Sequence, residues 1–202
     1  MKRHWLLPET PDVLGLLVHQ GQLTLAGVEA LGRWAEGDSS QASLVEARQV
    51  DATEARRAVL MAIRRAFTTA LEPEDLFELS ERLAAVLTQA KDLVREAEML
   101  AMAPDRAMAD IAGLVVAGVR TLVDAMPDLA RHPDTAIEAA DAAVIQEERI
   151  EGVYRKAMSA LVAEEDLREV SGRRELYRRS ARIGEATMRV AHRYWYAVVK
   201  RG

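Results

Sequence analysis

The sequence predicts an all-α protein built from six long helices. Its 202 residues are rich in Ala, Leu, Glu and Arg, and aromatic residues make up only 4%, a composition typical of helices and not of sheets. Apolar residues recur at helical spacing along most of the chain, and only short stretches with Pro, Gly, Asp or Ser separate these segments. We expect helices over about residues 11–36, 41–69, 73–102, 104–126, 133–162 and 166–200.

The first three expected helices begin at residues that favour a helix N-terminus. Asp12 lies in the first turn of the first helix, where a carboxylate interacts favourably with the macrodipole. A polar turn, EGDSSQ, separates this helix from the second. Pro73 opens the third, because proline is tolerated in a first helical turn, and Glu74 and Asp75 follow at its positive end. The apolar stripe expected on the second helix is Val45, Ala52, Val59, Ile63 and Phe67.

Prolines also delimit the helices of the second half. The fourth helix begins at Pro104 and ends before Pro127. Its middle, residues 111–119, is apolar all round and should be deeply buried. The fifth helix begins at Pro133, and Gly172 marks either a kink or a fresh start of the sixth.

The last helix combines an apolar stripe with a basic face. The aromatic cluster Tyr194–Tyr196 should dock its end onto the core. The basic face is either solvated or paired with acidic residues, or it binds phosphate or nucleic acid. The stripe consists of Leu176, Ile183, Val190, Tyr194 and Val198, and the basic face of Arg178, Arg179, Arg182, Arg189 and Arg193.

An internal repeat divides the six helices into two halves. LFELSERL at residues 76–83 matches LYRRSARI at residues 176–183, an offset of 100 residues. At the same offset, residues 50–51 align with residues 150–151. Each half then forms one three-helix unit, residues 1–102 and 103–202, joined in one continuous structure.

Composition and charge exclude several classes of protein. The chain has no cysteine, which excludes disulfides, thiolate metal sites and cysteine nucleophiles. Pro8, Glu9 and Asp12 interrupt any hydrophobic segment near the N-terminus, so we expect no signal peptide. Residues 111–119 are too few to span a bilayer. These features predict a soluble, cytoplasmic protein. Its net charge of −5 combines +6 from residue 166 onward with −11 in the remainder.

No motif of an enzyme stands out. None of the four histidines completes a Glu-x-x-His pair of a di-iron bundle. The chain contains neither a phosphate-binding loop nor a dinucleotide fingerprint, and no Ser, His and Asp form an evident triad. We therefore expect a protein that is not an enzyme.

Three carboxylates could still form a site between the last two helices. Glu147 and Glu151 lie four residues apart on one helical face, and Glu147 is in line with the apolar stripe. Their repulsion can be offset by Arg155, or by a metal ion held by carboxylates of two adjacent helices. Glu185 has the same two interpretations, because Arg182 and Arg189 flank it at helical spacing.

Several segments together resemble the PhoU-like family of phosphate-transport regulators. They are RHWLLPETPDVLGLL, LEPEDLFELSERLAAVL, EERIEGVYRKAMSAL and ELYRRSARIGEATMRVAHRYWYAVVK. The resemblance covers nearly the whole chain, and its last segment is the most specific. It points to a divergent branch whose members often accompany a Pit-type inorganic phosphate transporter. The family fold, two tandem three-helix bundles, agrees with the repeat.

The resemblance also implies a metal site, because family members bind metals such as iron or zinc through Glu-x-x-x-Asp pairs. Glu147 and Glu151 match the pair on the fifth helix and Glu185 matches one residue on the sixth, whose partner position is Ala181. In the first half Asp51 matches, but its partner position is Ala47. Positions expected to be acidic on the third helix are Ala84, Ala85 and Thr88. The second half therefore retains three carboxylates for iron, zinc or magnesium.

We thus expect an accessory protein that regulates phosphate uptake by binding a Pit-type transporter at the inner face of the membrane. Cytoplasmic loops of membrane proteins tend to be basic, so the acidic part of the chain is the expected contact surface. The alternative is a helical adaptor or nucleic-acid-associated protein that acts through the basic face of the last helix. The sequence is compatible with a homo-oligomer as well as with a monomer.

Overall fold

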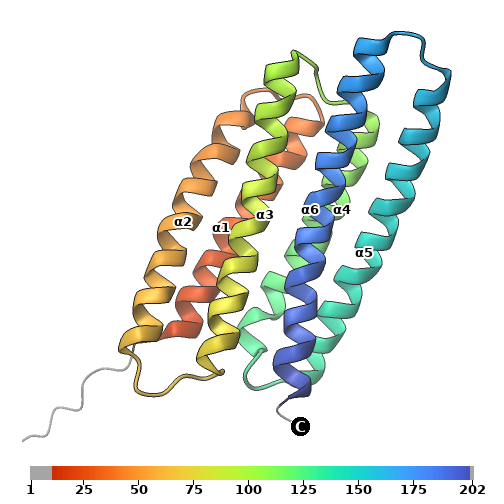
Figure 1. Cartoon of the computed structure of the whole chain (residues 1–202). Helices are drawn as coiled ribbons and strands as arrows, with labels where there is room; N and C mark the ends of the chain where they lie inside the picture. The colour runs from red at the N-terminus through yellow and green to blue at the C-terminus, as the bar shows by residue number, and fades with distance from the viewer. Residues whose placement is uncertain (1–10, 201–202) are drawn as a thin grey trace, which may run out of the picture.

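The computed structural model describes residues 11–200 as six long α-helices and two short 3-10 helices (Figure 1). No strand occurs in this range, which confirms the all-α prediction. Most of the N-terminal segment in which we expected no signal peptide lies outside the described residues. The elements are α1 (Val13–Ala35), α2 (Gln41–Arg65), α3 (Pro73–Leu100), α4 (Arg106–Ala125), η1 (Met126–Asp128), α5 (Pro133–Ala160), η2 (Leu161–Ala163) and α6 (Leu167–Val199).

The helices pack as two three-helix bundles that share a long interface. Helices α1, α2 and α3 contact one another, as do α4, α5 and α6. The bundles meet where α1 packs on α4 and α3 packs on α6. In Figure 1, α3 and α6 therefore run side by side in the middle, with α2 and α5 at the two outer edges. One apolar core extends through both bundles.

Side-chain caps and prolines begin the helices near the expected places. The Asp12 carboxylate accepts a hydrogen bond from the Gly15 amide at 2.9 Å, and Asp105 accepts one from the Met108 amide at 3.0 Å. Such caps satisfy amides that have no partner within the helix. Pro73 and Pro133 occupy first-turn positions of α3 and α5, as expected.

Two expectations about buried segments need correction. Helix α2 ends at Arg65 and not near residue 69, because the backbone of Ala66 is extended. Phe67, expected in the apolar stripe, is 95% exposed. Helix α4 packs against α1, α5 and α6 and buries Val115, but Gly113 is exposed, so the segment 111–119 is not buried all round.

Helix α6 continues through Gly172 without a break. A Cβ atom at this position would lie 2.3 Å from the sulfur of Met102, so the glycine allows α6 to approach the α3–α4 connection closely. The interpretation of Gly172 as a fresh helix start is wrong, because α6 begins at Leu167.

Two tyrosines of α6 bind the two ends of α4. The Tyr177 hydroxyl donates to Asp105, the N-cap of α4, at 2.6 Å. The Tyr194 hydroxyl donates to the Leu122 carbonyl in the last turn of α4 at 2.7 Å. Carbonyls in the last turn of a helix have no hydrogen-bond donor within the helix, so the Tyr194 hydroxyl supplies the missing donor. Of the aromatic cluster expected to dock the last helix, Tyr194 is fully buried and docks as expected, whereas Tyr196 is 52% exposed.

The internal repeat is right for α3 and α6 but shifted for α2 and α5. Leu76 and Leu176 are both fully buried, as the offset of 100 residues requires. In contrast, Val50 is 51% exposed whereas Ile150 is 2% exposed. The buried pairs 45/143, 52/150 and 59/157 match α2 to α5 at an offset of 98 residues. Asp51 is therefore not the structural counterpart of Glu151.

Candidate functional site

The three candidate carboxylates lie on neighbouring helices of the second bundle. Glu147 and Glu151 are on α5 and Glu185 is on α6. Glu147 is partly buried, whereas Glu151 and Glu185 are exposed. Burial raises the pKa of Glu147 most, and the charges of Glu151, Glu185 and Glu148 raise it further. Glu147 therefore experiences the repulsion expected of a carboxylate cluster.

Arginines on the same helices neutralise the two exposed carboxylates. Arg155 lies 3.2 Å from Glu151, and Arg189 lies 3.5 Å from Glu185. Both are pairs of residues four apart, the geometry expected of solvated helix faces. Among residues 11–200, no group of three or more His, Asp or Glu is placed to hold a metal ion. A metal at these carboxylates stays a prediction.

Sequence reasoning missed His192 as a neighbour of this cluster. Its charge opposes the rise in the pKa of Glu147, which shows that the imidazole lies near that carboxylate. The ring stacks on Trp195 with centroids 5.3 Å apart. The spacing of seven residues between Glu185 and His192 was the available signal, since it places both on one face of α6.

The candidate residues of the first half are engaged in ion pairs. Asp51 lies 2.8 Å from Arg48 on the same helix. Glu46, one residue out of phase with the expected pair, contacts Arg95 of α3.

The basic face of α6 is largely paired with carboxylates. Arg179 contacts Glu96 of α3 at 2.8 Å and Glu175 at 2.9 Å, and Arg178 also contacts Glu175. Arg193 is only 7% exposed, so of the alternatives for this face it is paired with acidic residues and not solvated. These pairs support the interpretation that the arginines balance acidic residues.

The buried arginine belongs to a cluster that joins the end of α6 to the start of α3. Asp75 is fully buried, and its two carboxylate oxygens lie 2.7 Å from Arg193 and 2.7 Å from Lys200. Both contacts are ion pairs, and they hold a carboxylate that has no other hydrogen-bond partner among residues 11–200. Arg193 also lies over the Tyr196 ring, 4.6 Å from its centroid. Interactions first with Asp75 and then with Glu72 raise the pKa of Lys200.

An acidic surface runs along α5 and includes one carboxylate in the last turn of α4. Its five carboxylates are exposed, and no ion pair or hydrogen bond joins their side chains to other residues in the range 11–200. Four of them recur at helical spacing along α5, so they share one face. An exposed Ile145 lies among them. The residues of this acidic surface are Asp124, Asp134, Glu138, Asp141 and Glu148.

Comparison with known proteins identifies the fold. No protein-family model matches the sequence, and no curated protein does. Among solved structures, the phosphate transport system regulatory protein PhoU from Streptococcus pneumoniae has a TM-score of 0.74 at 14% identity, covering 92% of this chain and 93% of that one.

Two structures from Shewanella oneidensis MR-1 are also similar. A PhoU-like protein has a TM-score of 0.69 at 15% identity, covering 94% of this chain and 97% of that one. A PhoU-like phosphate regulatory protein has a TM-score of 0.66 at 14% identity, covering 93% and 99%. The predicted resemblance to the PhoU-like family is confirmed at the level of the fold, whereas the branch associated with Pit-type transporters stays a prediction.

Proposed function

We propose that this protein is a non-enzymatic regulator of inorganic phosphate transport. The observation that carries the proposal is the PhoU fold, shared over 92% of the chain with a phosphate transport system regulatory protein. Within residues 11–200 no helix is long and apolar enough to cross a membrane. In this proposal the protein acts at the cytoplasmic face of a membrane transporter, to which it binds, as the resemblance to phosphate-transport regulators implies.

The acidic surface on α4 and α5 is the proposed contact with the transporter. Its carboxylates carry no compensating ion pair in the described chain, so they can attract a basic partner. Short cytoplasmic loops of membrane proteins carry an excess of Lys and Arg. Complementary charge of this kind raises the association rate and selects the partner. The segments that resemble the Pit-associated branch make a Pit-type phosphate transporter the partner we propose.

The proposed metal site would require a rearrangement of ion pairs. Glu151 and Glu185 would have to leave Arg155 and Arg189, which lie 3.2 and 3.5 Å away. Both arginines are exposed and could turn into water. Glu147, Glu151 and Glu185 would then offer oxygen ligands to iron, zinc or magnesium, with waters completing the shell.

The nucleic-acid alternative is less favoured by the side-chain contacts. Four of the five arginines on the basic face form ion pairs with carboxylates. A phosphate backbone would have to compete with each of these pairs.

Deletion of the gene in the source organism tests the proposed function. We expect a change in the rate of phosphate uptake or in the amount of transporter in the membrane. The change should be reversed when the gene is restored on a plasmid. If both quantities are the same with and without the gene, the proposal is wrong.

A further inference from the structure

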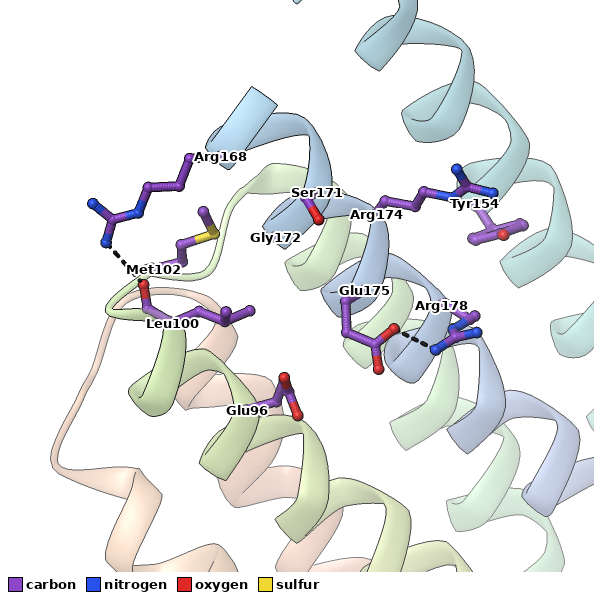
Figure 2. Close-up of a pocket in the computed structure, with 10 residues that line it drawn as sticks. All are labelled: Glu96, Leu100, Met102, Tyr154, Arg168, Ser171, Gly172, Arg174, Glu175 and Arg178. Atoms are coloured by element: carbon purple, nitrogen blue, oxygen red, sulfur yellow. Dashed lines mark hydrogen bonds and ion pairs between the residues drawn. The ribbon is translucent and has the colours of Figure 1, made fainter. Parts of the chain in front are cut away.

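A pocket with a volume of about 690 Å³ opens between α3, α5 and α6 (Figure 2). Glu96 and Leu100 line it from the end of α3, and Met102 from the connection to α4. Tyr154 contributes from α5. The first turns of α6 form the remaining wall, which is rich in arginine. The pocket uses none of the residues of the acidic surface.

The charge of the pocket is positive once its ion pairs are counted. Three lining arginines, Arg168, Arg174 and Arg178, face two lining glutamates, Glu96 and Glu175. Arg179, behind the wall, binds both glutamates, at 2.8 and 2.9 Å. Glu175 also pairs with Arg178, so Arg168 and Arg174 are the lining arginines that form no ion pair among residues 11–200. Three lining arginines against two lining glutamates leave the pocket with a net positive charge.

Several hydrogen-bond donors of the pocket have no acceptor among residues 11–200. The Arg174 side chain makes no ion pair or hydrogen bond with any described residue, and in Figure 2 it extends from α6 toward α5, where Tyr154 lies. The hydroxyls of Tyr154 and Ser171 donate to no described residue either. Within the described chain, the Arg168 guanidinium donates only to the Leu100 carbonyl, at 3.5 Å. A ligand with several anionic oxygens would complete this set, because guanidinium groups bind such oxygens in pairs.

The size and walls of the pocket indicate more than a bare anion. Small-molecule sites usually measure about 300–1,000 Å³, and inorganic phosphate would occupy a small part of the 690 Å³ present. Leu100, Met102 and the Tyr154 ring provide apolar surface beside the arginines. Aromatic faces of this kind stack on planar ligand groups.

We propose that this pocket binds a phosphate-bearing small molecule that is larger than inorganic phosphate. The arginines of α6 would hold its phosphate groups, and Leu100, Met102 and Tyr154 would contact the remainder. The site goes beyond the proposed regulation of transport. Its test uses the purified protein alone, so its failure would leave the proposed transporter contact untouched.

Titration calorimetry in about 0.15 M salt, where the Debye length is about 8 Å, tests the proposal with ATP, tripolyphosphate and inorganic phosphate as probes. We expect ATP or tripolyphosphate to bind with a dissociation constant below about 1 mM and inorganic phosphate to bind at least about tenfold more weakly. Arg174→Glu should weaken the binding at least about tenfold, because it removes a charged donor and adds a repulsive charge. The matched control is Arg182→Glu. Arg182 is an exposed arginine of α6 that lies outside the pocket and forms no ion pair among residues 11–200. This substitution should change the affinity less than about twofold.

A variant with the opposite expected effect separates binding from damage to the fold. Glu175→Gln removes one negative charge and releases Arg178, so the affinity should rise by about threefold or more. The proposal is overturned if neither ATP nor tripolyphosphate binds, if inorganic phosphate binds as tightly as they do, or if Arg174→Glu and Arg182→Glu have equal effects. A loss of affinity in Glu175→Gln would also overturn it.

Discussion

Replacing Arg193 with methionine tests the ion cluster that joins α6 to α3. Arg193 is 7% exposed, and its partner Asp75 is fully buried. Removing one partner of a buried ion pair costs about 3–5 kcal/mol, because the remaining charge has no compensation. Lys200 would still lie 2.7 Å from the other Asp75 oxygen, so we expect the lower limit, about 3 kcal/mol.

This loss should appear in both chemical and thermal unfolding. For a chain of 202 residues, about 3 kcal/mol corresponds to a decrease in Tm of roughly 6–12 °C. Urea unfolding at pH 7, followed by circular dichroism, measures the free energy directly. Arg182→Met is the control, since this exposed arginine forms no ion pair with any residue in the range 11–200, and it should change stability by less than about 0.5 kcal/mol.

A double variant isolates the charge interaction from the loss of packing. Asp75→Asn combined with Arg193→Met leaves no buried carboxylate, so it should be at least about 1 kcal/mol more stable than Arg193→Met alone. The reasoning is refuted if Arg193→Met loses less than about 1 kcal/mol. It is equally refuted if the two substitutions are additive.

Three further predictions concern the second bundle. Tyr194→Phe should cost about 1–3 kcal/mol in urea unfolding, because the Leu122 carbonyl loses its donor; an unchanged midpoint would contradict this. Glu147→Gln should stabilise the protein at pH 7 by about 0.3 kcal/mol, since the raised pKa means that ionised Glu147 is disfavoured in the folded state. That gain should vanish as the pH falls below 4.5, the ordinary pKa of a glutamate, because the carboxyl is then protonated in both the folded and the unfolded state. Thermal unfolding at several pH values measures the gain. A gain that persists at lower pH, or an equal gain in Glu138→Gln, would count against the prediction. If the carboxylates hold a metal, elemental analysis should find iron, zinc or magnesium in the purified protein and less in Glu147→Ala, whereas equal amounts in both would exclude this site.

Local signals in the sequence predicted most of the helix boundaries. Pro73 and Pro133 begin α3 and α5 because proline suits a first turn, and Asp12 caps α1. The end of α2 at Arg65 was missed, since no glycine or proline follows until Pro73. The extended backbone of Ala66 depends on tertiary packing and not on local propensity.

The contacts of the site were harder to predict because they join distant parts of the chain. Arg193 and Glu74 are 119 residues apart, and helical periodicity alone does not tell which acidic residue pairs with Arg193. The pairs within one helix, such as Glu151 with Arg155, followed from their spacing of four residues. The pocket beside Arg174 was not predicted, since it forms only when α3, α5 and α6 come together.

Phosphate uptake in a deletion strain that carries altered copies of the gene tests the central claim most directly. One copy carries lysines in place of Glu138, Asp141 and Glu148 of the acidic surface. A matched copy carries lysines in place of three exposed carboxylates elsewhere, Glu36, Glu54 and Glu98. We expect the matched copy to restore the uptake of radiolabelled phosphate to the wild-type rate and the first copy to leave it at the rate of the deletion strain. Equal restoration by both copies would contradict the proposed contact with the transporter.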